Sequence, residues 1–126
     1  MIHIKIYESY NNLGEIELIS VEEAPLYKAF DIHINYKKVG TLDVGFYKED
    51  LKNNQAEIVG ISINSEFRGM GIGKLAVNKL FLEFPNIDSF IAMPTEESIG
   101  FWKSIGATEY YKGYFIIKRN SSRFID

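Results

Sequence analysis

Cysteine is absent from this sequence of 126 residues. Its absence excludes a disulfide framework, a thiol nucleophile and a cysteine-ligated zinc site, and it suits a reducing compartment. Long apolar runs are also missing, because no stretch approaches the roughly 20 residues that span a bilayer. Residues 1–6 lack the basic start and apolar run of a signal peptide. We therefore expect a cytoplasmic protein with no membrane partner.

Positive charge is scarce and scattered. The 14 Lys and Arg residues are outnumbered by 17 Asp and Glu, which gives a formal net charge of −3. Surfaces that bind nucleic acids cluster Lys and Arg, so we expect no nucleic-acid partner. The two histidines, His3 and His33, have no metal-ligand spacing, so we expect no metal. The densest basic group, interpreted as a solvated strand face and tail, comprises Lys112, Lys118, Arg119 and Arg123.

Apolar residues are plentiful, at 46% of the chain, and they include nine Phe and eight Tyr. This length and composition predict one folded domain over residues 1–126. Alternation of apolar and polar residues indicates strands early in the chain, with a hairpin turn at Lys37 and Lys38. The predicted extended segments are 2–6, 15–20, 26–36, 39–47 and 56–63.

The second half of the chain alternates helical and extended patterns. Apolar residues recur at helical spacing from Ile72 to Phe84, where Pro85 ends the helix. Thr95 is placed to cap a second helix, with two acidic residues in its first turn. The predicted strands around these helices are 89–93 and a terminal hairpin of 109–111 and 114–119.

A glycine-rich turn joins the strand 56–63 to the first helix. It contains Arg68, Gly69, Gly71 and Gly73. Glycines allow a tight turn and a close approach of backbone N–H groups to a ligand, and a helix N-terminus attracts anions. Two well-known phosphate motifs do not fit, since a Walker loop needs Ser or Thr after Gly-Lys and a dinucleotide fingerprint needs G-x-G-x-x-G. An ordinary strand-to-helix turn is the alternative reading.

The spacing R-x-x-G-x-G at Arg68, Gly71 and Gly73 resembles the coenzyme A signature of the GNAT superfamily of acyl-CoA N-acyltransferases. The segment 101–107 is similar to a second motif of that family, with Trp102 at the usual tyrosine position and Ala107 at an aromatic one. The resemblance covers roughly residues 40–118.

The resemblance implies an α/β (α+β) fold: a mixed, mostly antiparallel central sheet flanked by helices, with a helix on each face. Residues 9–24 leave little room for the two helices that usually follow the first strand, so we expect a reduced N-terminal helical region. The strand 89–93 would splay from its neighbour to open a cleft for acetyl-CoA. The residues implied for the cofactor are Ile61, Ser62, Ile63, Arg68, Gly69, Met70, Gly71, Ile72, Gly73, Lys74 and Trp102.

Acetyl transfer to an amine needs a base, an oxyanion donor and a route for the departing thiolate. Glu57 is our candidate base, because alternation puts it on the face of Ile61 and Ile63, where partial desolvation favours proton acceptance. Its place also resembles that of the glutamate base in the histone-acetyltransferase branch; alternatively it sits at a solvated strand start. Backbone N–H groups at 61–63 would stabilise the oxyanion.

The general acid is harder to assign. Trp102 replaces the family's tyrosine, and an indole N–H does not deliver a proton at neutral pH. We interpret Trp102 instead as a wall of the pantetheine channel. The remaining candidates for the acid are Tyr110, Tyr111 and Tyr114.

The leading functional prediction is an N-acetyltransferase that moves an acetyl group from acetyl-CoA to a primary amine by direct attack in a ternary complex. The alternative is a non-catalytic acetyl-CoA sensor or assembly subunit with a degenerate fold of this family. A third reading is a structural interaction domain whose glycine turn binds nothing. The acceptor stays open among small amines, amino acids, antibiotics and proteins, and the terminal hairpin could pair in a homodimer.

Overall fold

The computed structural model describes residues 15–46, 51, 52 and 54–119. The predicted strand at 2–6 and the basic residue Arg123 lie outside these residues. The described helical elements are α2 (Ile72–Glu83), α3 (Ile99–Ser104) and two single 3₁₀ turns, η1 (Ser65–Phe67) and η2 (Glu96–Ser98). The strands are β1 (Ile16–Ala24), β2 (Tyr27–Ile34), β3 (Lys37–Gly45), β4 (Gln55–Ile63), β5 (Ser89–Ala92), β6 (Thr108–Glu109) and β7 (Phe115–Lys118).

All of these strands belong to one sheet with the order β1-β2-β3-β4-β5-β7-β6. Neighbours are antiparallel except for β4 and β5, which are parallel because the helix α2 connects them. The prediction of a mixed, mostly antiparallel sheet is therefore confirmed. The terminal hairpin is also confirmed, with its strands at β6 and β7.

The strand β1 leads directly into β2 through Pro25 and Leu26, so no helix separates these two strands. Within residues 9–24, where a reduced helical region is expected, the described residues hold β1 and no helix, and residues 9–14 lie outside the described residues. The next turn lies at Asn35 and Tyr36, with φ of 51° and 68°, and not at Lys37 and Lys38 as predicted. A two-residue hairpin turn needs positive φ at both central positions, and Asn accepts that conformation readily.

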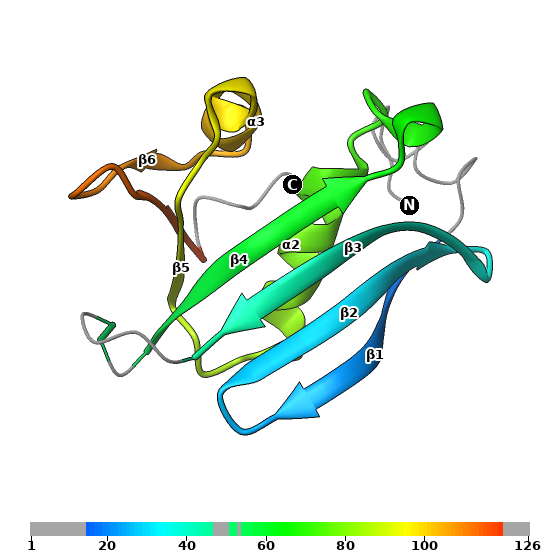
Figure 1. The fold of residues 1–126 in the computed structure, drawn as a ribbon, viewed down its shortest axis with the longest axis horizontal. Helices are drawn as coiled ribbons and strands as arrows, with labels where there is room; N and C mark the ends of the chain where they lie inside the picture. The colour runs from blue at the N-terminus through cyan, green and yellow to red at the C-terminus, as the bar shows by residue number, and fades with distance from the viewer. Residues whose placement is uncertain (1–14, 47–50, 53, 120–126) are drawn as a thin grey trace.

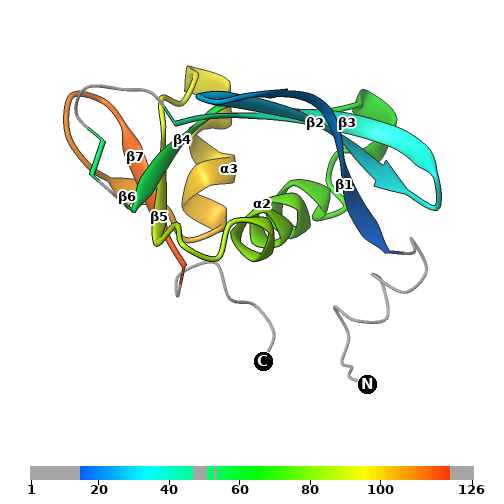
Figure 2. The same ribbon diagram turned by 90° about the horizontal axis from the view of Figure 1, so that it is seen from below.

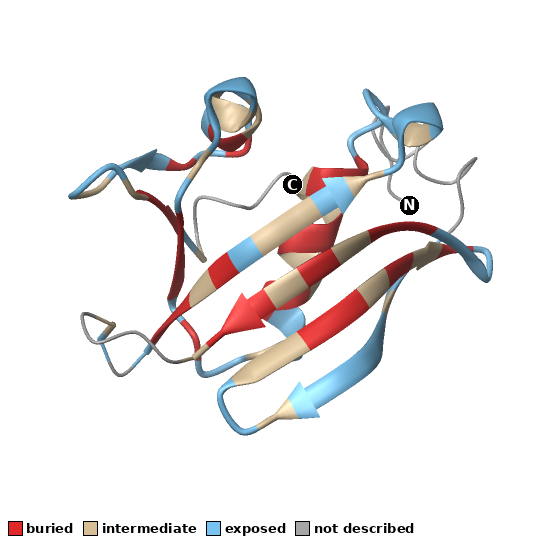
Figure 3. Cartoon of the chain, in the orientation of Figure 1, coloured by how far each residue is buried: buried red, intermediate tan, exposed pale blue. Residues whose placement is uncertain are grey.

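One apolar core holds the sheet and both helices together. The core joins Leu42 of β3, Phe90 of β5, Leu80 of α2 and Trp102 of α3, each at most 4% exposed. Figure 2 shows both helices on the same side of β1, β2 and β3. The prediction of a helix on each face is therefore wrong for the described residues: Trp102 and Ile105 contribute to the same core as α2. Figure 3 shows buried residues on β2, β3 and α2 and along β5 and β7, whereas β1 is mostly exposed.

Arg119, just beyond β7, caps the C-terminal end of α2. Its guanidinium donates to the carbonyl oxygens of Phe81 (2.9 Å) and Phe84 (3.0 Å), and it also donates to Pro85 (3.2 Å) and Ile87. The interpretation of the C-terminal basic group as a solvated surface is thus wrong for this half-buried arginine. None of the described helices has the length and apolarity needed to cross a membrane.

Candidate functional site

The turn between β4 and α2 depends on two glycines with left-handed backbone. Gly69 has φ of 79° and Gly71 has φ of 80°, a region that glycine enters without the penalty of a Cβ atom. Gly71 is the residue before α2, and its carbonyl accepts the N–H of Leu75 at 3.1 Å. A Cβ at either glycine would meet no protein atom within 4 Å. The loop is therefore lined by exposed backbone that a ligand can approach.

Gly73 has a different role, which is to let α2 and α3 pack closely. A Cβ at Gly73 would lie 2.7 Å from Cε1 and 3.0 Å from Cζ of Phe101. Because real Cβ atoms do not approach carbon so closely, a larger residue here would displace the Phe101 ring. Gly73 thus sets the position of an aromatic ring beside the glycine loop.

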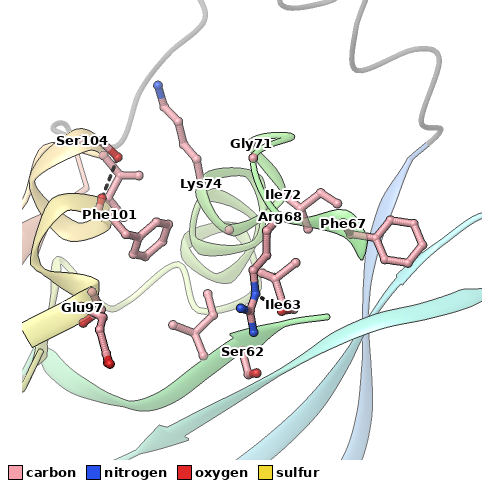
Figure 4. Close-up of a pocket in the computed structure, with 15 residues that line it drawn as sticks. Ser62, Ile63, Phe67, Arg68, Gly71, Ile72, Lys74, Glu97, Phe101 and Ser104 are labelled. Carbon is pink, nitrogen blue, oxygen red and sulfur yellow. Dashed lines mark hydrogen bonds between the residues drawn. The ribbon is translucent and has the colours of Figure 1, made fainter. Parts of the chain in front are cut away.

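A cavity of about 550 Å³ opens between the end of β4, the glycine loop and α3 (Figure 4). All the predicted cofactor residues line it except Met70 and Trp102. Met70 is 46% exposed on the surface, and Trp102 is 4% exposed in the core. The lining residues that the sequence did not identify are Phe67, Glu97, Ser98, Phe101, Ser104 and Ile105.

Phe101 stands where the sequence suggested Trp102. The two rings contact each other edge to face at 5.0 Å between centroids, with Phe101 toward the cavity and Trp102 toward the core. Consecutive helical residues point about 100° apart, so only one of the pair can line a wall. The interpretation of Trp102 as a channel wall therefore shifts to Phe101.

Two basic side chains flank the loop, and the start of α2 adds a further positive end. Arg68 is exposed and points toward β4, where its Nε donates to the carbonyl oxygen of Ile63 at 2.8 Å (Figure 4). Lys74 points away from β4 (Figure 4). The first N–H groups of an α-helix lack partners within the helix and carry the positive end of its dipole. The loop can therefore offer a pyrophosphate the charges of Arg68 and Lys74 and the N–H groups at the start of α2.

The strands β4 and β5 separate beside this cavity. They pair only at Gln55 with Ser89, Ala56 with Phe90 and Glu57 with Ile91. Beyond Glu57, β4 and β5 run apart, and β5 leads toward α3 (Figure 1). From Ile58 onward, the edge of β4 that faces β5 has no strand partner among the described residues. Its backbone N–H groups are those expected to stabilise an oxyanion.

Glu57 lies at the point where the two strands part, but on the face opposite to the one predicted. The buried core residues Leu42 and Val44 pair with Ile61 and Ile58, which places both isoleucines toward the core. Glu57 pairs with Gly45 and faces away from the core. An irregularity of register between Ile58 and Gly60 shifts the alternation of side chains by one residue. The prediction that Glu57 and Ile61 share a face was therefore wrong. Gly60 inside the strand was the available signal.

None of the three candidate tyrosines lines the cavity at the glycine loop. Tyr110 reaches β4, where its hydroxyl accepts a hydrogen bond from Nε2 of Gln55 at 3.4 Å. Gln55 is two residues before Glu57 and shares its face. The ring centroids of Tyr111 and Tyr114, in the same hairpin, lie 6.4 Å apart. The structure thus brings Tyr110 into contact with the strand of the candidate base.

Two further groups lie on the same face as Glu57. A hydrogen bond from Tyr27 to the carboxylate of Asp43, with added desolvation and negative charge nearby, raises the pKa of the Tyr27 hydroxyl. Tyr27 therefore stays protonated at neutral pH and serves Asp43 as a donor.

The described residues contain no group of three His, Cys, Asp or Glu that could hold a metal ion.

Comparisons with known proteins agree with this geometry. The family model of the acetyltransferase (GNAT) family matches residues 5–107. An acetyltransferase from Thermus thermophilus has a TM-score of 0.64 at 17% identity, over 75% of this chain and 65% of that chain. Escherichia coli YhhK, solved with bound coenzyme A, has a TM-score of 0.63 at 12% identity, over 78% of this chain and 76% of that chain. A chain of the KacTA–DNA complex reaches 0.62 at 10% identity, over 79% and 72%.

No curated protein matches the sequence significantly. At identities below 25%, the similarity to the solved structures shows a common fold and does not transfer their substrates. The chain spans less than two thirds of the length of the Thermus protein.

Proposed function

Because the chain belongs to the acetyltransferase (GNAT) family, we propose that it transfers an acetyl group from acetyl-CoA to a primary amine. The family uses acetyl-CoA, and one structural neighbour was solved with coenzyme A bound. The observation that carries the proposal is the cavity between the glycine loop, α3 and the end of β4, because β4 is also the strand that carries Glu57, although Glu57 itself does not line the cavity.

The cavity divides into a polar end and an apolar wall. The pyrophosphate of acetyl-CoA would lie at Gly69 to Gly73, with backbone N–H groups as donors and Arg68 as the nearby cation. Ile61, Phe101 and Ile105 would line the path of the pantetheine arm, because they form the apolar wall toward α3. The thioester would then reach the separation of β4 and β5.

Direct transfer follows from this placement. A carboxylate at Glu57 accepts a proton from the ammonium form of the acceptor, and the free amine attacks the thioester carbonyl carbon. Backbone N–H groups on the free edge of β4 stabilise the oxyanion. The C–S bond then breaks, and the nitrogen of the new amide gives its second proton to the departing thiolate, so that an amide and the thiol of coenzyme A are formed. A thiol of pKa about 8.5 leaves readily as its thiolate, so a general acid at the position of Trp102 is not required.

The second candidate function is a non-catalytic acetyl-CoA sensor or assembly subunit. Two observations favour it: a tryptophan buried in the core at the position of the family's tyrosine, and a direct turn from β1 to β2 without intervening helices. A sensor would bind acetyl-CoA without releasing coenzyme A. An enzyme would release it when an amine is supplied.

The absence of cysteine makes the decisive assay simple. A thiol reagent will report coenzyme A released from acetyl-CoA with no background from the protein. We expect amine-dependent release in a panel of primary amines. Release from none of them, together with calorimetric binding of acetyl-CoA, would establish the sensor. Absence of binding as well would remove both functions.

The role of Glu57 has its own test. Glu57→Gln keeps the size of the side chain but removes proton acceptance, so we expect the transfer rate near neutral pH to fall by about 10²–10⁴. Acetyl-CoA affinity should change little, and part of the rate should return at higher pH, where an amine of pKa about 10 deprotonates by itself. A variant as fast as the parent protein across this range would exclude Glu57 as the base.

A further inference from the structure

A second cavity, of about 530 Å³, lies at the opposite end of β4 and β5 from the glycine loop. Its floor is a row of three side chains on adjacent strands, Gln55, Ser89 and Lys118, which pair across β4, β5 and β7. The next row along the same strands begins with Glu57. Residues two apart on a strand share a face and lie about 7 Å apart. The cavity is therefore adjacent to the candidate base, on the face that Glu57 occupies.

The buried floor of this cavity contains an unused hydrogen-bonding group. Ser89 is only 6% exposed, and its hydroxyl has no hydrogen-bond partner among the described residues. Gln55 is 8% exposed and held in place, since its Oε1 accepts from the N–H of Lys52 at 3.1 Å and its Nε2 donates to Tyr110. A buried hydroxyl without a partner costs stability unless a ligand or water satisfies it. Ser89 thus presents a hydroxyl to this cavity that a ligand or a water molecule can satisfy.

The charges around the floor favour an anionic group. Lys52 and Lys118 line the cavity from two sides. Arg119 also borders it, but its guanidinium is engaged with the carbonyl oxygens at the end of α2. The acidic neighbour Asp88 accepts a hydrogen bond from Nδ2 of Asn54 at 2.6 Å. Two lysines beside one carboxylate give the mouth a positive balance in a protein whose net charge is −3.

We propose that this cavity binds the carboxylate of the acceptor, so that the acceptor is an amino acid whose amine reaches Glu57. The inference rests on the proposed acetyl transfer. The carboxylate would accept hydrogen bonds from the hydroxyl of Ser89 and from the ammonium of Lys118. The Cα spacing of about 7 Å between adjacent rows matches a molecule of amino-acid size, with the amine directed along β4 toward the acetyl group.

The first experiment compares each amino acid with the amine that lacks its carboxylate, for example lysine with cadaverine and ornithine with putrescine. We expect kcat/KM to be at least tenfold higher for the amino acid. Lys118→Glu should abolish this preference by raising KM for the amino acid, while KM for acetyl-CoA stays unchanged. Lys79→Glu changes the net charge equally on α2, away from both cavities, and should retain the preference. Equal kcat/KM for the members of each pair would overturn the proposal.

A second measurement separates this proposal from the transfer reaction. Titration with the same amino acids should shift the backbone amide resonances of Gln55, Ser89 and Tyr110 in the parent protein, even if no acetyl transfer is detected. Ser89→Ala removes only the buried hydroxyl and should weaken binding at least threefold. Shifts without transfer to these amino acids or to any amine of the panel would refute the enzymatic function and leave the cavity as an amino-acid site. Absence of shifts in the parent protein would refute the cavity itself.

Discussion

The two ends of α2 satisfy their backbone groups in opposite ways. At the C-terminal end, one arginine, Arg119, donates to carbonyl oxygens of four residues and lies over the ring of Phe81 at 5.0 Å. At the N-terminal end, the helix begins after Gly71 without a side-chain cap. The chain therefore satisfies one end of the helix with its own side chain and leaves the other end without one. The contrast separates a residue that stabilises the fold from the loop that we propose binds acetyl-CoA.

The largest effect, on stability, is expected from removing the arginine that caps the C-terminal end of α2. Arg119→Met keeps the apolar contact with Phe81 but leaves partly buried carbonyl oxygens without donors. We expect the free energy of unfolding to fall by about 2–4 kcal/mol, since hydrogen bonds to a charged group are lost together. Acetyl-CoA affinity per folded molecule should not change. Urea unfolding and calorimetry measure the two quantities.

Arg119→Lys is the matched control, because it retains the charge but cannot contact several carbonyls in the same plane. Its loss of stability should lie between those of the parent protein and Arg119→Met. A fully stable Arg119→Met variant would mean that the carbonyl oxygens find water instead, and the contrast between the two ends would fail.

Gly71→Val tests the uncapped N-terminal end of α2. No protein atom lies within 4 Å of the added Cβ, so the expected cost in stability is only that of a positive φ, about 1–2 kcal/mol. The valine would occupy the space that the ligand needs, so acetyl-CoA affinity should fall more than tenfold, by over about 1.4 kcal/mol. Gly113→Val, which also places a β-branched residue at a positive φ (84°) but does not line the cavity, is the control. If unfolding accounts for the whole effect of Gly71→Val, the turn has only a structural role.

Arg68→Glu should sharpen the comparison further, because it changes charge without touching the turn. A negative side chain beside the pyrophosphate should weaken acetyl-CoA binding about tenfold, or about 1.4 kcal/mol. Stability should change little, because Arg68 is exposed and makes one hydrogen bond to the carbonyl of Ile63. Equal affinities in calorimetry, with an intact circular dichroism spectrum, would remove Arg68 from the binding site.

The smallest effect concerns salt. Acetyl-CoA affinity of the parent protein should decrease as ionic strength rises, since exposed charges are screened over about 8 Å at physiological salt. The decrease should be weaker in Arg68→Glu, which has lost one attractive charge. The stability contributed by Arg119 should respond much less, because its partners are partly buried carbonyl oxygens. An equal salt response at both ends would contradict the contrast.

Local signals in the sequence were sufficient for the glycine loop. A strand, Gly69, Gly71 and a helix follow one another within a short segment, and the positive φ angles at these glycines are local properties of the backbone. The resemblance of this segment to the coenzyme A signature identified most of the lining of the cavity. It failed for Trp102, because a motif aligned along the chain does not specify which of two neighbouring helical residues turns toward the core.

What the sequence by itself determined are the features that depend on neighbours along the chain: the strand and helix order, the glycine turn, and Glu57 as a carboxylate at a given distance before it. Only the tertiary structure decided which face Glu57 occupies, because an irregularity in the pairing of β3 and β4 shifts the alternation. It also decided that Arg119 completes α2 and that Ser89 lies beside Gln55 with no hydrogen-bond partner for its hydroxyl among the described residues. Those contacts join residues more than 30 positions apart, and chain order alone does not encode which distant partners the packing of the sheet brings together.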